Sequence, residues 1–171
     1  DMSGIMNIGD AGNGIVNVTG GGHITDRLST LGYASGARGL LDVRGAGSQW
    51  QSTSALYVGG AGRGILRVTA GATAMDDIGQ IGRFAGGEGH AFVDGEGSLW
   101  YNNSELTVGA EGTGTLLVSN AGRVVAGRLV IGAGSASFGR GVLADLMGAP
   151  GQALGELEVC LVDLSPDALA T

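Results

Sequence analysis

Two tryptophans occupy matching places in two similar stretches of the sequence. Trp50 ends the segment GSQW, and Trp100 ends the segment GSLW fifty residues later. Aromatic rings that stand exposed in a row can stack on the sugar rings of a glycan, so Trp50 and Trp100 are candidate carbohydrate or partner contacts. The recurrence also fits aromatic side chains that cover the core at a corner of each repeat. We favour this second interpretation, because the position belongs to the repeat itself.

Asp76 and Asp77 form the only adjacent pair of carboxylates in the chain. Enzymes that cleave glycosidic bonds use two carboxyl groups, one as acid and one as base or nucleophile. No basic or aromatic cluster in the sequence accompanies the pair, and a solvated turn is the simpler interpretation. We therefore predict no catalytic residue and no enzymatic activity.

Three further patterns resemble ligand sites only in part. The segment GGAGRG at 59–64 lacks the Lys-Ser/Thr ending and the following helix of a phosphate-binding loop. The segment GGEGHAFVDG at 86–95 resembles half of a calcium-binding nonapeptide, but Ala91 stands where the required Asp should be. His23 and His90 are isolated from other ligand residues. We expect neither a cofactor nor a metal ion.

The composition narrows the functional classes. The chain has 36 glycines among 171 residues, is 43% hydrophobic and carries a net charge of -7. The hydrophobic content argues against disorder, and the negative charge argues against a nucleic-acid partner or an anionic membrane surface. No apolar run approaches the ~18 residues of a membrane span. The single cysteine, Cys160, makes no internal disulfide. Because the chain begins with Asp1 rather than Met, we expect it to be part of a longer protein.

The elements that must hold these residues come from a fifty-residue repeat. The three copies open with MNIGDAGNGIVNV, LYVGGAGRGILRV and LTVGAEGTGTLLV. Each copy is itself a doubled unit of roughly 22–28 residues, a length that suits one coil of a solenoid. The chain therefore divides into β-helix repeats over 1–143, with copies near 6–55, 56–105 and 106–143, and a tail over 144–171 that is an irregular last coil, a cap or non-repeat sequence.

Within each unit, apolar residues alternate with variable ones and are bounded by glycine. Leu66 and Val68 flank Arg67, and Leu116 and Val118 flank Leu117. Alternation with period two predicts short strands with one constant apolar face, and glycines supply the corners. Strands this short need identical neighbours in the next coil. We predict an all-β fold, a parallel β-solenoid in the form of a right-handed β-helix with about six or seven coils. The matched residues Val58, Leu66, Val68, Val108, Leu116 and Val118 are expected to point inward.

The segments LYVGGAGRGILRV, VDGEGSLW and LTVGAEGTGTLLV resemble the repeats of autotransporter (type V secretion) passengers and of PEP-CTERM-associated surface proteins. The resemblance covers roughly residues 5–143. It implies a β-helical stalk on the bacterial cell surface or in a secreted protein, often an adhesin, whose parent protein carries a C-terminal outer-membrane barrel. Host or bacterial surface glycans or proteins are the partners that it implies.

The function expected from the sequence is therefore a non-enzymatic structural segment that projects from the cell and contributes to adhesion. Two alternatives come from other classes. One is a β-helix enzyme acting on polysaccharides, which requires a cluster of acids in successive coils. The other is a self-assembling fibre subunit, because the open ends of a solenoid expose unpaired strand edges that allow end-to-end self-association.

Overall fold

The structure is a computed structural model that describes residues 4–132 and 160–162. All regular structure in this part of the chain is β-strand, and it holds no helix that could cross a membrane. The strands are β1 (Ile5–Ile8), β2 (Asn13–Val18), β3 (His23–Leu31), β4 (Arg38–Arg44), β5 (Gln49–Val58), β6 (Arg63–Thr69), β7 (Thr73–Ile81), β8 (Glu88–Asp94), β9 (Leu99–Val108), β10 (Thr113–Ser119), β11 (Arg123–Gly132) and β12 (Cys160–Val162).

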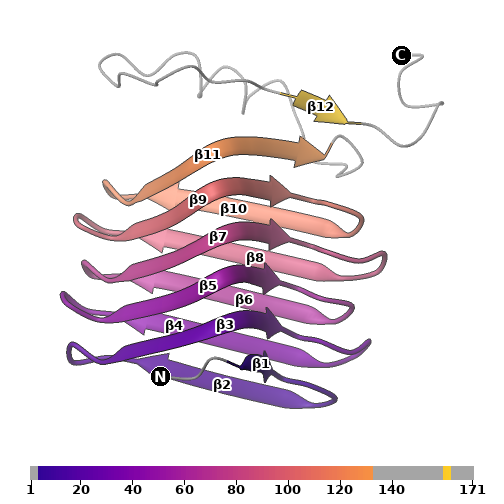
Figure 1. The fold of residues 1–171 in the computed structure, drawn as a ribbon, viewed down its shortest axis with the longest axis horizontal. Coiled ribbons are helices and arrows are strands. Elements are labelled where there is room, and N and C mark those ends of the chain that lie inside the picture. The colour runs from indigo at the N-terminus through magenta and orange to yellow at the C-terminus, as the bar shows by residue number, and fades with distance from the viewer. Residues whose placement is uncertain (1–3, 133–159, 163–171) are drawn as a thin grey trace.

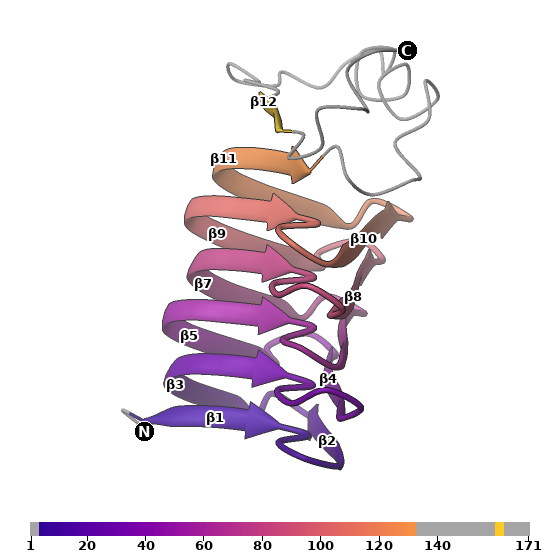
Figure 2. The ribbon, with the colours of Figure 1, turned by 90° about the vertical axis from the view of Figure 1, so that its right-hand side faces the viewer.

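These strands stack into two parallel sheets that face each other (Figure 1, Figure 2). Sheet A has the order β1-β3-β5-β7-β9-β11-β12, and sheet B has the order β10-β8-β6-β4-β2. Because strands β1 to β11 alternate between the sheets, each pair of consecutive strands makes one coil. The fold is a parallel β-solenoid, as predicted. The described residues hold about five coils, so the sixth and seventh predicted coils would fall outside them.

Apolar side chains from both sheets fill the space between them. In sheet B, Leu41, Leu66 and Ala91 lie in register on successive strands, and each is fully buried. The inward prediction is confirmed for Val58, Leu66 and Val68, which are also fully buried. Val108 on β9 and Leu116 on β10 are partly buried and also pack against the core. Val118 on β10 is 42% exposed rather than buried, because among the described residues β10 has a sheet neighbour on one side only.

The repeat spans two coils rather than one because successive coils differ in sheet A. In sheet B the register advances by the same step at every coil, as from Gly39 to Gly64 to Gly89. In sheet A a longer step alternates with a shorter one: Leu31 pairs with Val58, and Val58 pairs with Ile81. The strands β5 and β9 each hold one more residue than β3 and β7, and register shifts mark the irregularity. Two unlike coils therefore form the true repeat.

Part of the predicted tail continues sheet A. Strand β12 pairs in parallel with β11, with Ile131 opposite Leu161. The predicted boundary between 143 and 144 lies outside the described residues.

The close stacking of corners predicts a large difference between two glycines at the same repeat position. A Cβ atom added at Gly62 would lie 2.4 Å from the carbonyl oxygens of Ala34 and Ala37 in the coil beneath, whereas one added at Gly12 would meet nothing within 4 Å. We expect Gly62→Ala to destabilise the protein by about 2 kcal/mol or more, and Gly12→Ala to change its stability by less than about 0.5 kcal/mol. Thermal melts of both variants test this. Equal melting temperatures would contradict the corner packing.

Candidate functional site

Both tryptophans lie in the core. Trp50 on β5 and Trp100 on β9 are fully buried. The indole Nε1–H of Trp50 donates to Ser52 Oγ at 3.2 Å, and that of Trp100 donates to Asp76 Oδ2 at 2.6 Å. Neither ring face is open to a ligand. This corrects the prediction of Trp50 and Trp100 as carbohydrate or partner contacts, and it agrees with the favoured interpretation as core residues.

The serines of the Gly-Ser-x-Trp segments form hydrogen bonds to the corner of the preceding coil. Ser48 Oγ accepts the backbone N–H of Gly21 at 3.1 Å, and Ser98 Oγ accepts that of Gly71 at 3.0 Å. Both serines are buried. The recurrence of this motif in each double coil is therefore explained by packing and hydrogen bonding between coils.

The two adjacent aspartates point to opposite sides of sheet A. Both lie on β7 rather than in a solvated turn, which corrects that interpretation. Asp76 is 5% exposed and faces the core. Asp77 faces outward, where it accepts hydrogen bonds from Ser104 Oγ at 2.6 Å and Asn103 Nδ2 at 2.9 Å. Two carboxylates on opposite faces of a sheet cannot act on one glycosidic bond.

Asp76 belongs to a buried polar row that crosses four coils on the inner side of sheet A. Asp26 on β3, Ser52 on β5, Asp76 on β7 and Asn102 on β9 are register partners in turn, and all four are buried. This set is called the polar row below. Buried polar groups normally carry hydrogen bonds, so the pairing of each member is informative.

The two halves of the polar row are satisfied to different degrees. Asp26 accepts hydrogen bonds from Ser52 Oγ at 2.7 Å and from Ser29 Oγ. At the equivalent positions of the second repeat, fifty residues later, Gly79 replaces Ser29 and Asn102 replaces Ser52. Asp76 therefore keeps only the indole donor on Oδ2. Its Oδ1 and the Oδ1 of Asn102 are buried without a hydrogen-bond partner.

Burial dominates the titration of both acids in the row. It raises the pKa of Asp26, and the hydroxyls of Ser29 and Ser52 partly offset this by stabilising the charged form. Burial raises the pKa of Asp76 to about 7, against the lowering effect of the Trp100 hydrogen bond, and the neighbouring charge of Asp77 adds to the rise.

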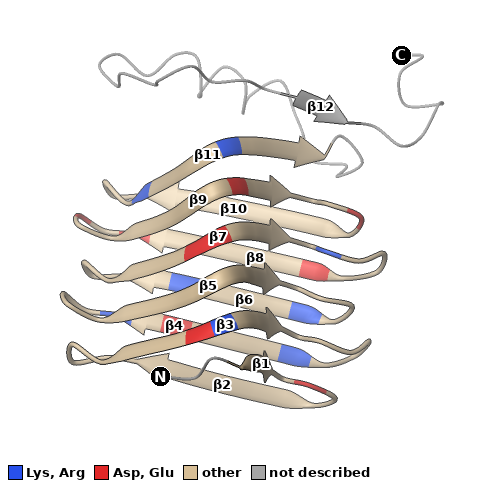
Figure 3. Cartoon of the chain, in the orientation of Figure 1, with Lys and Arg blue, Asp and Glu red and all other residues tan. Residues whose placement is uncertain are grey.

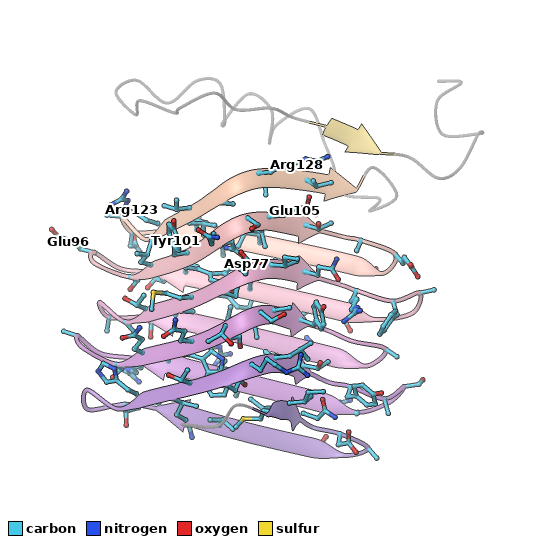
Figure 4. The ribbon with its side chains drawn as sticks, in the orientation of Figure 1. Asp77, Glu96, Tyr101, Glu105, Arg123 and Arg128 are labelled. Carbon is cyan, nitrogen blue, oxygen red and sulfur yellow. The ribbon has the colours of Figure 1, made fainter. Side chains whose placement is uncertain are left out.

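The outer face of the solenoid carries hydrogen bonds between neighbouring coils. Asp94 Oδ1 accepts from both Ser119 Oγ and Asn120 Nδ2 at 2.7 Å, in the same arrangement as Asp77 with its two donors. These donors, led by the serine hydroxyl, lower the pKa of each exposed aspartate. On sheet A, Glu105 and Arg128 form an ion pair whose closest N–O distance is 3.3 Å, and Figure 4 labels it together with Asp77 and Tyr101. Tyr101 is 38% exposed.

Basic residues gather on the outer face of sheet B despite the negative net charge. Arg38 and Arg44 lie on β4, and Arg63 and Arg67 lie on β6 (Figure 3). On β8, Glu88 Oε2 lies 3.8 Å from Arg63 Nε. Glu88 Oε1 forms a hydrogen bond with His90 Nε2 at 2.7 Å. The His90 hydrogen bond is the main cause that lowers the Glu88 pKa, and Arg63 adds to it.

The partial ligand motifs of the sequence lie on ordinary parts of the coil. The segment 59–64 forms the corner into β6, a strand rather than a helix, so the element that follows it offers no helix N-terminus to an anion. The segment 86–95 runs through β8. Within residues 4–132 and 160–162, no three His, Cys, Asp or Glu side chains are placed to bind a metal ion together.

No protein-family model, curated protein or solved structure matches the chain. The polar row is the feature that sequence reasoning missed. A signal was present: Asp26 and Asp76 stand two residues after the inward-facing Ile24 and Ala74, in phase with the buried positions. An aspartate at an inward-facing position of the alternation is easily overlooked, because charged residues are rarely buried without a partner.

Proposed function

We propose that the chain is a non-enzymatic, stalk-forming segment of a bacterial surface-exposed or secreted, autotransporter-like protein that projects from the cell and contributes to adhesion. The observation that carries this proposal is the continuous parallel pairing of strands β1 to β11 in two sheets. Such stacking makes stability a sum over coils and their interfaces, so length can be added without altering the fold.

The side chains support a structural role over catalysis. The buried acids Asp26 and Asp76 accept hydrogen bonds from the next coil. The outer acids Asp77 and Asp94 are likewise held by donors from the next coil. The outward positions differ from coil to coil, as in the row Asp42, Arg67, Phe92. A rod with varied outward residues supports many weak contacts, whose combined strength can exceed that of any one.

Cysteine labelling on intact cells tests the location and the fold together. In the parent protein with Cys160→Ser, Ser35→Cys places a thiol at an exposed corner, and Val68→Cys places one at a fully buried position. We expect a membrane-impermeant maleimide to label Ser35→Cys on whole cells, and to label Val68→Cys only after denaturation. Labelling of Ser35→Cys only after cell lysis would overturn the surface location.

Activity assays test the non-enzymatic part of the proposal. Turnover of an acidic polysaccharide that is abolished by Asp77→Asn, the exposed member of the pair, would overturn the stalk proposal in favour of an enzyme. Asp10→Asn, which changes another exposed carboxylate on a corner, is the matched control.

A further inference from the structure

The polar row contains two acceptor oxygens that face no donor. Asp76 Oδ1 and Asn102 Oδ1 are buried and without a partner, and their residues are paired across neighbouring strands β7 and β9. An ionised carboxylate and an amide oxygen are both acceptors, so they cannot satisfy each other. Leaving both unpaired in the core costs the full desolvation of each group.

The orientation of the Asn102 amide follows from its other neighbour. Asn102 Nδ2 lies 3.5 Å from the carbonyl oxygen of Val125, which can accept its hydrogen. Reversing the amide would place two acceptors together at Val125. The amide oxygen is therefore the atom left without a donor.

The space beside Asn102 Oδ1 is already filled. A Cβ atom added at Gly79 would lie 2.1 Å from this oxygen, 2.9 Å from Leu106 Cδ1 and 3.1 Å from Trp100 Cζ2. There is no room for a methyl group there, and hence none for a bridging water on that side. A donor must come from within the pair.

We infer that the structure assigns a buried proton-binding site at Asp76: the carboxyl group is neutral, holds its proton on Oδ1 and donates it to Asn102 Oδ1, while Oδ2 accepts the indole N–H of Trp100. One proton satisfies both orphaned oxygens. The site goes beyond the proposed stalk function and does not depend on it.

The surroundings of Asp76 favour the neutral acid. Asp77, next to it on β7, is negatively charged and adds repulsion. Asp26 lies two coils away in the same row, behind Ser52. Within the described residues, the strands packed against β7 present no titratable side chain inward: β5 presents Ser52, β9 presents Trp100 and Asn102, and the facing strands β8 and β10 present Ala91, Val93 and Leu116.

The consequence for stability has a definite sign. The folded pKa of Asp76, about 7, lies above the unfolded value of 3.8, so the folded state binds the proton more tightly. The stabilisation is complete below pH 4 and is lost as the pH rises towards 7. Asp76 by itself should lower the folding equilibrium constant about tenfold per pH unit across this window, and the raised pKa of Asp26 acts in the same direction. The lowered pKa values of Asp77, Glu88 and Asp94 act with the opposite sign and at lower pH.

Carboxyl-carbon NMR titration of the wild-type chain tests the site directly. We expect one aspartate resonance with a midpoint near pH 7, which is removed by Asp76→Asn and retained in Asp77→Asn. A titration of Asp76 near pH 4, together with the exposed acids, would overturn the proposal. Because the midpoint is measured on the wild-type protein, the titration tests the proposal even if a variant fails to fold.

Two variants test the proton's role in stability. Asp76→Asn supplies a permanent N–H donor for Asn102 Oδ1. Between pH 4 and 7, denaturant melts of this variant should therefore lack the fall of about tenfold per pH unit in the folding equilibrium constant that Asp76 causes in the wild type. Asp77→Asn should keep that dependence. Asn102→Ser, which copies Ser52, supplies a hydroxyl donor and should lower the midpoint of Asp76. An unchanged midpoint in Asn102→Ser, or an unchanged dependence in Asp76→Asn, would contradict the shared proton.

Discussion

Deletion of residues 66–90 is expected to destabilise the solenoid more than deletion of residues 66–115, although the second removes twice as many residues. Both deletions join β6 to a strand in correct sheet B register, because Leu66 is aligned with Ala91 and Ala91 with Leu116. They differ in what is stacked on β5. The shorter deletion places β9 there, and the longer one places β11.

The physical reason is the alternation of large and small inward residues. In the native chain Ala74 separates Trp50 from Trp100, and Gly79 separates Leu56 from Leu106. Trp100 and Leu106 occupy the space over Gly79. Without β7, these side chains meet the large residues of β5.

Overpacking of this kind costs about 1–3 kcal/mol at each site, so two or three sites would consume much of a stability of about 5–15 kcal/mol. The longer deletion instead places Val124 over Trp50 and Leu129 over Leu56, much as they lie natively over Trp100 and Leu106. Far-UV circular dichroism and thermal melts measure the difference. A higher melting temperature for the shorter deletion would show that rod length, not the two-coil repeat, governs stability.

Truncation of one inward side chain should also have a large effect. Leu66 is fully buried between Leu41 and Ala91 in the sheet B ladder. Leu66→Ala should cost about 2–5 kcal/mol, because the transfer free energy is lost and a cavity remains. Arg67→Ala, at the exposed neighbour, should change the free energy of unfolding by less than about 0.5 kcal/mol.

Denaturant melts give the two free energies, and hydrogen exchange locates the damage. In a solenoid, the loss at Leu66 should be felt mainly in β4, β6 and β8. Equal effects of the two substitutions would show that the assigned inner and outer faces are wrong.

Much of the fold could be predicted from local patterns. The alternation around Leu66 and Val68 predicted both strand and face, because side chains on a strand point to opposite sides in turn. The fifty-residue recurrence predicted the stacked coils. The prediction was less accurate at the end of the described part of sheet B, where Val118 is exposed because β10 has only one sheet neighbour among the described residues.

The candidate site was less accessible to the same reasoning. Trp50 and Trp100 recur with the repeat, which indicates packing, but their burial depends on coils above and below. The adjacent pair of Asp76 and Asp77 resembles a solvated turn in the sequence. In the fold it is part of a strand, so one acid faces the core and the other faces solvent.

The sequence by itself determined the solenoid, its strands and the apolar inner face, because each depends on residues close together in the chain. The tertiary structure alone decided which donors reach each buried acid. Asp76 meets Trp100 and Asn102 of the next coil, while Asp26 meets Ser52. Hydrogen bonding and burial set the protonation of a carboxyl group, and both come here from neighbouring coils. For that reason two aspartates at the same repeat position have different environments.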